Sequence, residues 1–171
     1  KDGWDHLIGS VHYIRVPKAN YSPEVYPESA NFSKLAGEDA MYYRYDDDYI
    51  YIPVDESAEI TRTAADLYFG GDIYSFVECY FETAGGVAER TGCSIIGHFD
   101  LVTKFNERSP MIDTSHPRYV AAYRAALDRL IPYGKPFEIN SNAVRKGYRT
   151  TPYPSKEILA EIKARGGKII L

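Results

Sequence analysis

The second half of the chain constrains the fold most, because short apolar runs alternate there with helical segments. The apolar runs are residues 94–98, 137–140 and 168–171, and the segments between them carry apolar side chains at helical spacing. Pro117 marks the first turn of one such helix, and a glycine follows each helix. This alternation is typical of parallel strands that are joined by helices. The sequence therefore predicts an α/β fold with a parallel sheet.

The first half contains a long stretch in which apolar residues follow neither the spacing of a helix nor that of a strand. We expect one buried strand over residues 5–13 that ends near His12, followed by an irregular insert or lid over residues 15–55. Within that insert, short strands are expected on either side of an acidic turn at residues 46–48.

Helical signals follow this insert. A first helix is predicted to begin at Asp55 or Ser57, and a second to run from Asp72 to Gly92. With 171 residues, the chain is long enough for one hydrophobic core, and we expect a single domain over residues 1–171.

Composition and charge narrow the class of protein. The net charge of −4 and the scattered basic residues argue against a general nucleic-acid binder, and no apolar run is long enough for a membrane span. Cys79 and Cys93 lack the spacing of metal ligands and are expected to be reduced thiols. Nothing in the opening residues indicates secretion. We therefore expect a cytoplasmic protein with neither a nucleic-acid nor a membrane partner.

Two of the four histidines are candidates for chemistry. His12 and His98 each come at the carboxyl end of a predicted strand, and in β/α folds these ends face one shared cavity. Imidazoles at such a place suit zinc, iron or manganese. A purely structural role for both rings remains open on this pattern. His6 is expected to pack against its strand, and His116 to cap the helix at Pro117.

Three ordered motifs give the chain a resemblance to a known family. GSVHY, then GHFDLVTKF, then FEINSNAVRKGYRTTPYPS resemble the histidinol-phosphatase branch of the PHP (polymerase and histidinol-phosphatase) family. The resemblance implies that the chain is part of a distorted (β/α)7 TIM-like barrel. It also implies a cluster of divalent metals (zinc, iron or manganese), at which activated water hydrolyses a phosphomonoester. The implied substrate is histidinol phosphate, which would yield histidinol and phosphate in histidine biosynthesis.

The resemblance also implies roles for individual residues. His12 and His98 match two metal ligands of the family, and Asp100 matches an acidic residue that would support a ring or a loop by hydrogen bonding. Arg145 matches a basic residue that faces the substrate phosphate, and Asn140 is a further candidate for the substrate pocket.

Several motifs of the family do not occur in this sequence. The missing motifs are H-x-H and a bridging carboxylate before GSVH, and D-x-H on a last strand. Because the chain ends in an apolar strand, at residues 168–171, we expect it to be a central-to-C-terminal fragment of a longer protein. Its metal site is expected to be partial or empty, so that the fragment alone is inactive.

Two other functions remain open at this point. Other members of the family cleave phosphodiesters or nucleotides, and a chain without these motifs would also suit a non-catalytic scaffold. A fragment of a parallel sheet is further expected to leave unpaired edges and to self-associate through them.

Overall fold

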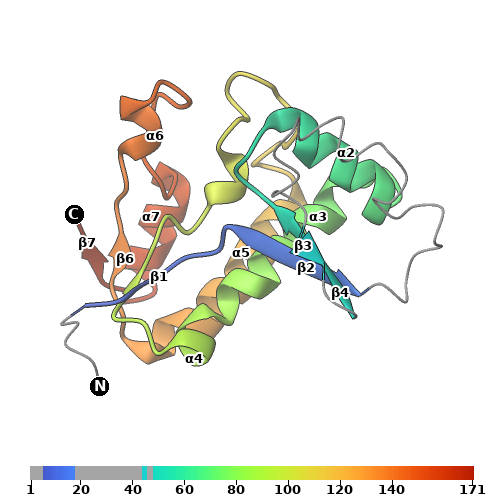
Figure 1. Ribbon diagram of the computed structural model, residues 1–171. Coiled ribbons are helices and arrows are strands. Elements are labelled where there is room, and N and C mark those ends of the chain that lie inside the picture. Colours follow the sequence, from blue (N-terminus) through green and yellow to red (C-terminus); the bar gives the residue numbers. More distant parts are fainter. Residues whose placement is uncertain (1–5, 18–43, 46–47) are drawn as a thin grey trace.

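The computed structural model describes residues 6–17, 44–45 and 48–171. It is a mixed α/β structure with two small sheets and a set of helices packed on a shared core (Figure 1). In Figure 1 the parallel sheet lies at the left with the C-terminus, and the antiparallel sheet lies toward the right, beside α3.

The first sheet is parallel and four-stranded. Its strand order is β1-β5-β6-β7, with the strands β1 (Ile8–Gly9), β5 (Ile95–Ile96), β6 (Phe137–Glu138) and β7 (Ile169–Ile170). Gly9, Ile96, Phe137 and Ile169 are aligned across the sheet by register. The predicted α/β class with parallel strands is thereby confirmed.

Helices connect the parallel strands in the predicted order. The connection from β5 to β6 holds η3 (Leu101–Thr103), α5 (Pro117–Leu130) and η4 (Ile131–Tyr133). The connection from β6 to β7 holds α6 (Asn142–Arg145) and α7 (Lys156–Ala164). His116 caps α5, since its side chain accepts a hydrogen bond from the backbone N–H of Arg118, as the sequence predicts.

The second sheet is antiparallel and has the order β2-β4-β3. It consists of β2 (Tyr13–Pro17), β4 (Tyr49–Pro53) and β3 (Arg44–Tyr45), which confirms the two short strands expected around the acidic turn. The helix α2 (Ala58–Tyr68) follows, with Ser57 as its N-cap. The helices α3 (Ile73–Gly85) and α4 (Val87–Thr91) come next. Most of the expected insert, residues 18–43 and 46–47, lies outside the described residues.

The opening strand was predicted wrongly. Instead of one strand over residues 5–13, the described part holds β1 and β2, which belong to different sheets, and a bend at His12 separates them. The reason is that the apolar side chains before and after the bend have different partners. Ile8 pairs with Ile95, whereas the buried Ile14 pairs with Ile52. Strand periodicity alone cannot reveal such a change of sheet.

Further predictions need correction. The helix expected from Asp72 to Gly92 is two helices, because α3 ends at Gly85 and α4 begins after Gly86. The strand expected over residues 137–140 ends at Glu138, and the short helix α6 was not predicted. His6 is exposed rather than packed, since its side chain reaches solvent ahead of β1.

One core unites both sheets and the helices. The helices α3 and α5 pack along each other and bring aromatic side chains together, among them Phe81 and Tyr119, whose ring centroids are 5.4 Å apart. Ile14, Ile50 and Ile52 join the same core from the antiparallel sheet. Among the described residues, no helix combines the length and the apolar character that crossing a bilayer requires.

Candidate active site

The candidate site lies where the two sheets meet. His12 occupies the bend between β1 and β2, and His98 follows β5, the neighbour of β1 in the parallel sheet. Their ring centroids are 4.9 Å apart, with the ring planes at 80°. The structure thus brings together the two imidazoles that the sequence singled out, although His12 comes from the bend after β1 and not from a strand.

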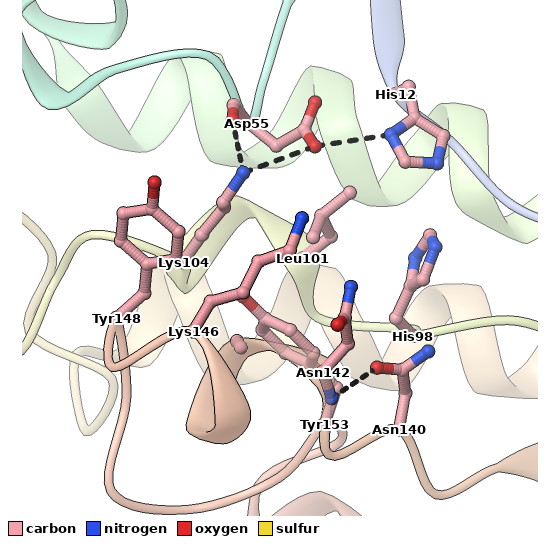
Figure 2. A pocket seen from close by; sticks show the side chains of 11 residues that line it. His12, Asp55, His98, Leu101, Lys104, Asn140, Asn142, Lys146, Tyr148 and Tyr153 are labelled. Atoms are coloured by element: carbon pink, nitrogen blue, oxygen red, sulfur yellow. Dashed lines mark hydrogen bonds and ion pairs between the residues drawn. The ribbon is translucent and has the colours of Figure 1, made fainter.

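Both imidazoles line one cavity of about 260 Å³ (Figure 2). Its walls come from distant parts of the chain: the bend after β1, the end of β4, the turn after β5, and the segment that follows β6. The remaining lining residues are Asp55, Leu101, Lys104, Asn140, Asn142, Ala143, Lys146, Tyr148 and Tyr153.

Asp55 joins a lysine to an imidazole at this cavity. Its carboxylate oxygen Oδ2 lies 3.3 Å from Nδ1 of His12 and 3.5 Å from Nζ of Lys104. Nζ of Lys104 also donates a hydrogen bond of 2.5 Å to the backbone carbonyl of Asp55. Burial by itself raises the pKa of Asp55, but the hydrogen bond from His12 and the charge of Lys104 outweigh it, and the pKa lies below its ordinary value. Asp55 is therefore ionised at neutral pH.

The hydrogen bond that fixes His98 comes from its backbone and not from its imidazole ring. The backbone N–H of His98 donates to Oε2 of Glu138 at 3.2 Å, and the residue has a φ of 20°, in the region that favours glycine. Burial lowers the pKa of the His98 imidazole, and the nearby charge of His12 lowers it further. Its buried Nδ1 has no hydrogen-bond partner among the described residues. His98 therefore offers a neutral imidazole to the cavity.

Amide side chains continue the wall from the end of β6. Nδ2 of Asn140 donates to Oε1 of Glu138, and Oδ1 of Asn140 accepts a hydrogen bond from the backbone N–H of Asn142 (Figure 2). The backbone of Asn140 also forms a bridge with Tyr153, whose ring is 6.3 Å from that of His98. Asn140, predicted as a pocket residue, thus lies in the wall beside His98.

Asp100 lies behind the cavity instead of within its lining. It is fully buried at 0% exposure, and its Oδ2 accepts a hydrogen bond from the backbone N–H of Ser155. The nearest cation is Arg149, whose guanidinium lies 3.8 Å from Oδ2 and 4.3 Å from the centre of the Tyr153 ring. Burial raises the pKa of Asp100 to about 6, against the opposing charge of Arg149. This placement suits the supporting role that was predicted for Asp100.

Arg145, like Asp100, is a predicted site residue that lies outside the cavity lining. It is exposed at the end of α6, and its guanidinium donates to Oδ1 of Asn142 at 2.9 Å. Two lysines, Lys104 and Lys146, line the cavity in its place. Sequence reasoning missed Lys104 and Asp55, although Lys104 belongs to the quoted GHFDLVTKF motif and Asp55 directly follows the apolar run of β4.

The donors at the cavity fit a divalent metal in kind. His12 and His98 supply two imidazole nitrogens, the donor type that zinc, iron and manganese accept. Within the described ranges no group of three or more His, Cys, Asp and Glu side chains is arranged to hold a metal ion. The described residues therefore fit part of a metal's ligand shell, which for zinc needs about three or four protein donors.

Comparison with known proteins adds one finding. No protein-family model matches the chain. A curated protein of Schizosaccharomyces pombe, named "Probable histidinol-phosphatase", is 29% identical to the chain over 121 residues. The match covers 70% of this chain and 39% of the relative, so the chain spans well under half of that protein. The chain is similar to part of a protein named as a probable histidinol-phosphatase.

Proposed function

We propose that this chain carries part of the active site of a metal-dependent phosphomonoesterase that converts histidinol phosphate to histidinol and phosphate. The observation that carries the proposal is the pair of imidazoles, His12 and His98, 4.9 Å apart in a cavity that two lysines also line. The similarity to the S. pombe protein supports the same reaction class. Membership of the PHP family, a cytoplasmic location and the role in histidine biosynthesis belong to this proposal.

His12 and His98 would hold the metal, whose positive charge would polarise phosphoryl oxygens and lower the pKa of water. Asp55 orients the imidazole of His12 through its contact with Nδ1. Glu138 fixes the turn that carries His98 by accepting the backbone N–H. These two carboxylates keep the imidazoles in place.

Positive charge at the cavity suits a phosphate group. Lys104 and Lys146 both line it. The ammonium group of Lys104 has three N–H donors, and its hydrogen bonds to Asp55 use two of them. Arg145, exposed one residue before Lys146, is a further cation for the same anion. Fixed cations stabilise the charge that spreads over phosphoryl oxygens during transfer. We assign the three cations to phosphate binding, and Asn140 to the pocket wall.

The proposal extends to the architecture. The parallel sheet of the described residues would form part of a distorted (β/α)7 barrel, and residues 15–55 would form an insert within a single PHP domain. Site residues at the carboxyl ends of adjacent parallel strands support this arrangement, because barrels of β/α units place their active sites there.

The experiment is phosphate release from histidinol phosphate by the longer protein in which we expect this chain to lie. With manganese or zinc added, we expect turnover that EDTA abolishes, and a loss of at least about 100-fold in kcat for His98→Ala. His116→Ala, which changes the cap of α5 at a residue outside the cavity lining, is the matched control and should keep near wild-type activity per folded molecule. Metal-independent activity, or an unaffected His98→Ala variant, contradicts the proposal.

The same assay distinguishes the substrate class. A phosphodiester or a nucleotide, offered at equal concentration, should be hydrolysed far more slowly than histidinol phosphate. The reverse order of rates would assign the site to a phosphodiesterase or nucleotide hydrolase. The 171-residue chain alone should release no phosphate at an enzymatic rate, because its described residues supply two imidazole donors.

A further inference from the structure

The contact between Asp55 and His12 has a consequence for the protons of the imidazole ring. A neutral imidazole carries its single N–H on either Nδ1 or Nε2, and the other nitrogen keeps a lone pair. In a free histidine side chain the Nε2–H form predominates. A carboxylate next to Nδ1 reverses this preference, because it can only accept a hydrogen bond there.

The structure places such a carboxylate at Nδ1 of His12. Oδ2 of Asp55 is 3.3 Å from Nδ1, and Figure 2 shows the other ring nitrogen of His12 on the side that faces His98. Lys104 keeps the carboxylate charged and in place, by donating to both the backbone carbonyl and Oδ2 of Asp55. Asp55 and Lys104 have side chains only 24% and 19% exposed, so that solvent competes weakly for their contact.

The backbone fixes this arrangement in advance. The strands β2 and β4 pair antiparallel with Tyr13 opposite Pro53, and the ladder continues by a hydrogen bond from the N–H of Val54 to the carbonyl of His12. His12 and Asp55 are thus the residues that leave the two paired strands on the same end of the sheet. Their side chains meet because of strand register and do not depend on a bound ligand.

We propose that Asp55 is a positioning residue that holds His12 in the Nδ1–H tautomer, with the lone pair of Nε2 directed into the cavity toward His98. Lys104 anchors Asp55 in this role. The tautomer is a property of the protein alone. Its use for metal binding rests on the proposed function, because only an unprotonated nitrogen can act as a ligand.

The experiment is long-range ¹H–¹⁵N NMR on histidine-labelled protein, which distinguishes protonated from unprotonated ring nitrogens. Spectra are recorded without metal, in EDTA, at a pH of about 9, where imidazoles are neutral. His12 is assigned by the signal that disappears in His12→Gln. We expect the wild type to show Nδ1–H as the major tautomer of His12, and D55A to shift the major population to Nε2–H.

Two further variants separate positioning from general damage. E56A removes the neighbouring exposed carboxylate and should leave the tautomer unchanged. D55N replaces the carboxylate by an amide of similar shape that can donate as well as accept, and should therefore lower the population of the Nδ1–H tautomer. A purely structural role for Asp55 predicts no change of tautomer in any folded variant. Amide spectra establish that each variant is folded.

Two outcomes overturn the proposal: an Nε2–H form of His12 in the wild type, or an unchanged tautomer in folded D55A. The first needs only the wild type and the assignment by His12→Gln, so the proposal stays open to refutation even if D55A does not fold. A failure of the phosphatase assay leaves the tautomer result intact, and the two proposals therefore fail separately.

Discussion

At the residue scale, the glycines before the two site histidines explain how closely the strands approach. Gly9 precedes Ser10 in the GSVH motif, and a methyl group added there would lie 2.6 Å from Sγ of Cys93. Gly97 precedes His98, and a methyl group there would lie 2.8 Å from a side-chain carbon of Ile8. Both glycines thus allow tight packing next to the site rather than an unusual backbone conformation.

We expect Gly9→Ala to destabilise the protein by about 1–3 kcal/mol, through overpacking against Cys93. Urea unfolding followed by circular dichroism measures the loss. Because the closest approach is to Sγ of Cys93, the added cost of Gly9→Ala should fall in a Cys93→Ala background. Part of the cost should remain, since the new methyl group would still lie 2.9 Å from Cβ at position 93 and 3.0 Å from Cγ2 of Val87. An equal cost in both backgrounds would show that Sγ of Cys93 is not the source of the strain.

Arg149 is a second residue whose replacement should have a large effect. It is 8% exposed and is the cation nearest the fully buried Asp100. We expect Arg149→Met to lower the free energy of unfolding by about 3–5 kcal/mol at neutral pH, since it leaves a buried carboxylate without its counter-charge. The exposed Arg62→Met should change it by less than about 0.5 kcal/mol. Equal effects of the two variants in urea unfolding would contradict this assignment.

At the element scale, α7 is attached to α5 through Glu161. The carboxylate of Glu161 accepts hydrogen bonds from the Tyr123 hydroxyl and from the guanidinium groups of Arg124 and Arg165. Burial alone would raise its pKa, but these donors outweigh burial and lower the pKa to about 2. A carboxyl group whose pKa is lower in the folded state than in the unfolded state stabilises the fold in its ionised form.

The pH dependence of this attachment has a definite sign. The contribution of Glu161 is complete above the unfolded-state pKa of about 4.5. It is lost as the pH falls toward about 2, because the unfolded state binds the proton more readily than the folded state, in which the carboxylate has to give up its hydrogen bonds. The stability difference between wild type and Glu161→Gln should therefore shrink between pH 5 and pH 2 in urea titrations. A constant difference across this range would exclude Glu161 as its source.

The elements also show what could be predicted from the sequence. Helices with a clear cap and stop were predicted closely, as for Ser57 before α2 and His116 before α5. The strands were predicted less well, because partners decide where a strand begins and ends. The bend at His12 depends on pairing with residues about 40 and 90 positions away, which no local pattern contains.

The site was predictable only in part for the same reason. His12, His98 and Asn140 share one cavity, as expected from strand ends. Asp55 was missed as a site residue because only the register of β2 with β4 brings it to His12. Lys104 was missed because a lysine after a turn resembles any exposed lysine until the tertiary contacts are known.

At the scale of the whole molecule, the parallel sheet ends in apolar edges. Ile8 on β1 is 51% exposed, and Ile170 on β7 is 40% exposed, although parallel sheets are usually covered on both faces. Open strand edges with apolar side chains favour pairing with another chain.

We therefore expect the 171-residue chain to self-associate, with a sedimentation coefficient that rises with concentration. Ile170→Lys should reduce this association, because a charge at an edge strand opposes pairing. Val144→Lys, at an exposed position on α6, is the matched control and should leave association unchanged. A wild-type monomer at every concentration would show that the edges are covered.

The bend at His12 gives the cavity one further property. His12 lies in the bend that joins the parallel sheet to the antiparallel sheet, whereas His98 follows β5 of the parallel sheet. An ion bound by a ring nitrogen of His12 and one of His98 would therefore link this bend to the parallel sheet. Because such an ion would bind the folded state alone, the free energy of unfolding of the whole molecule would rise with the logarithm of the ion concentration.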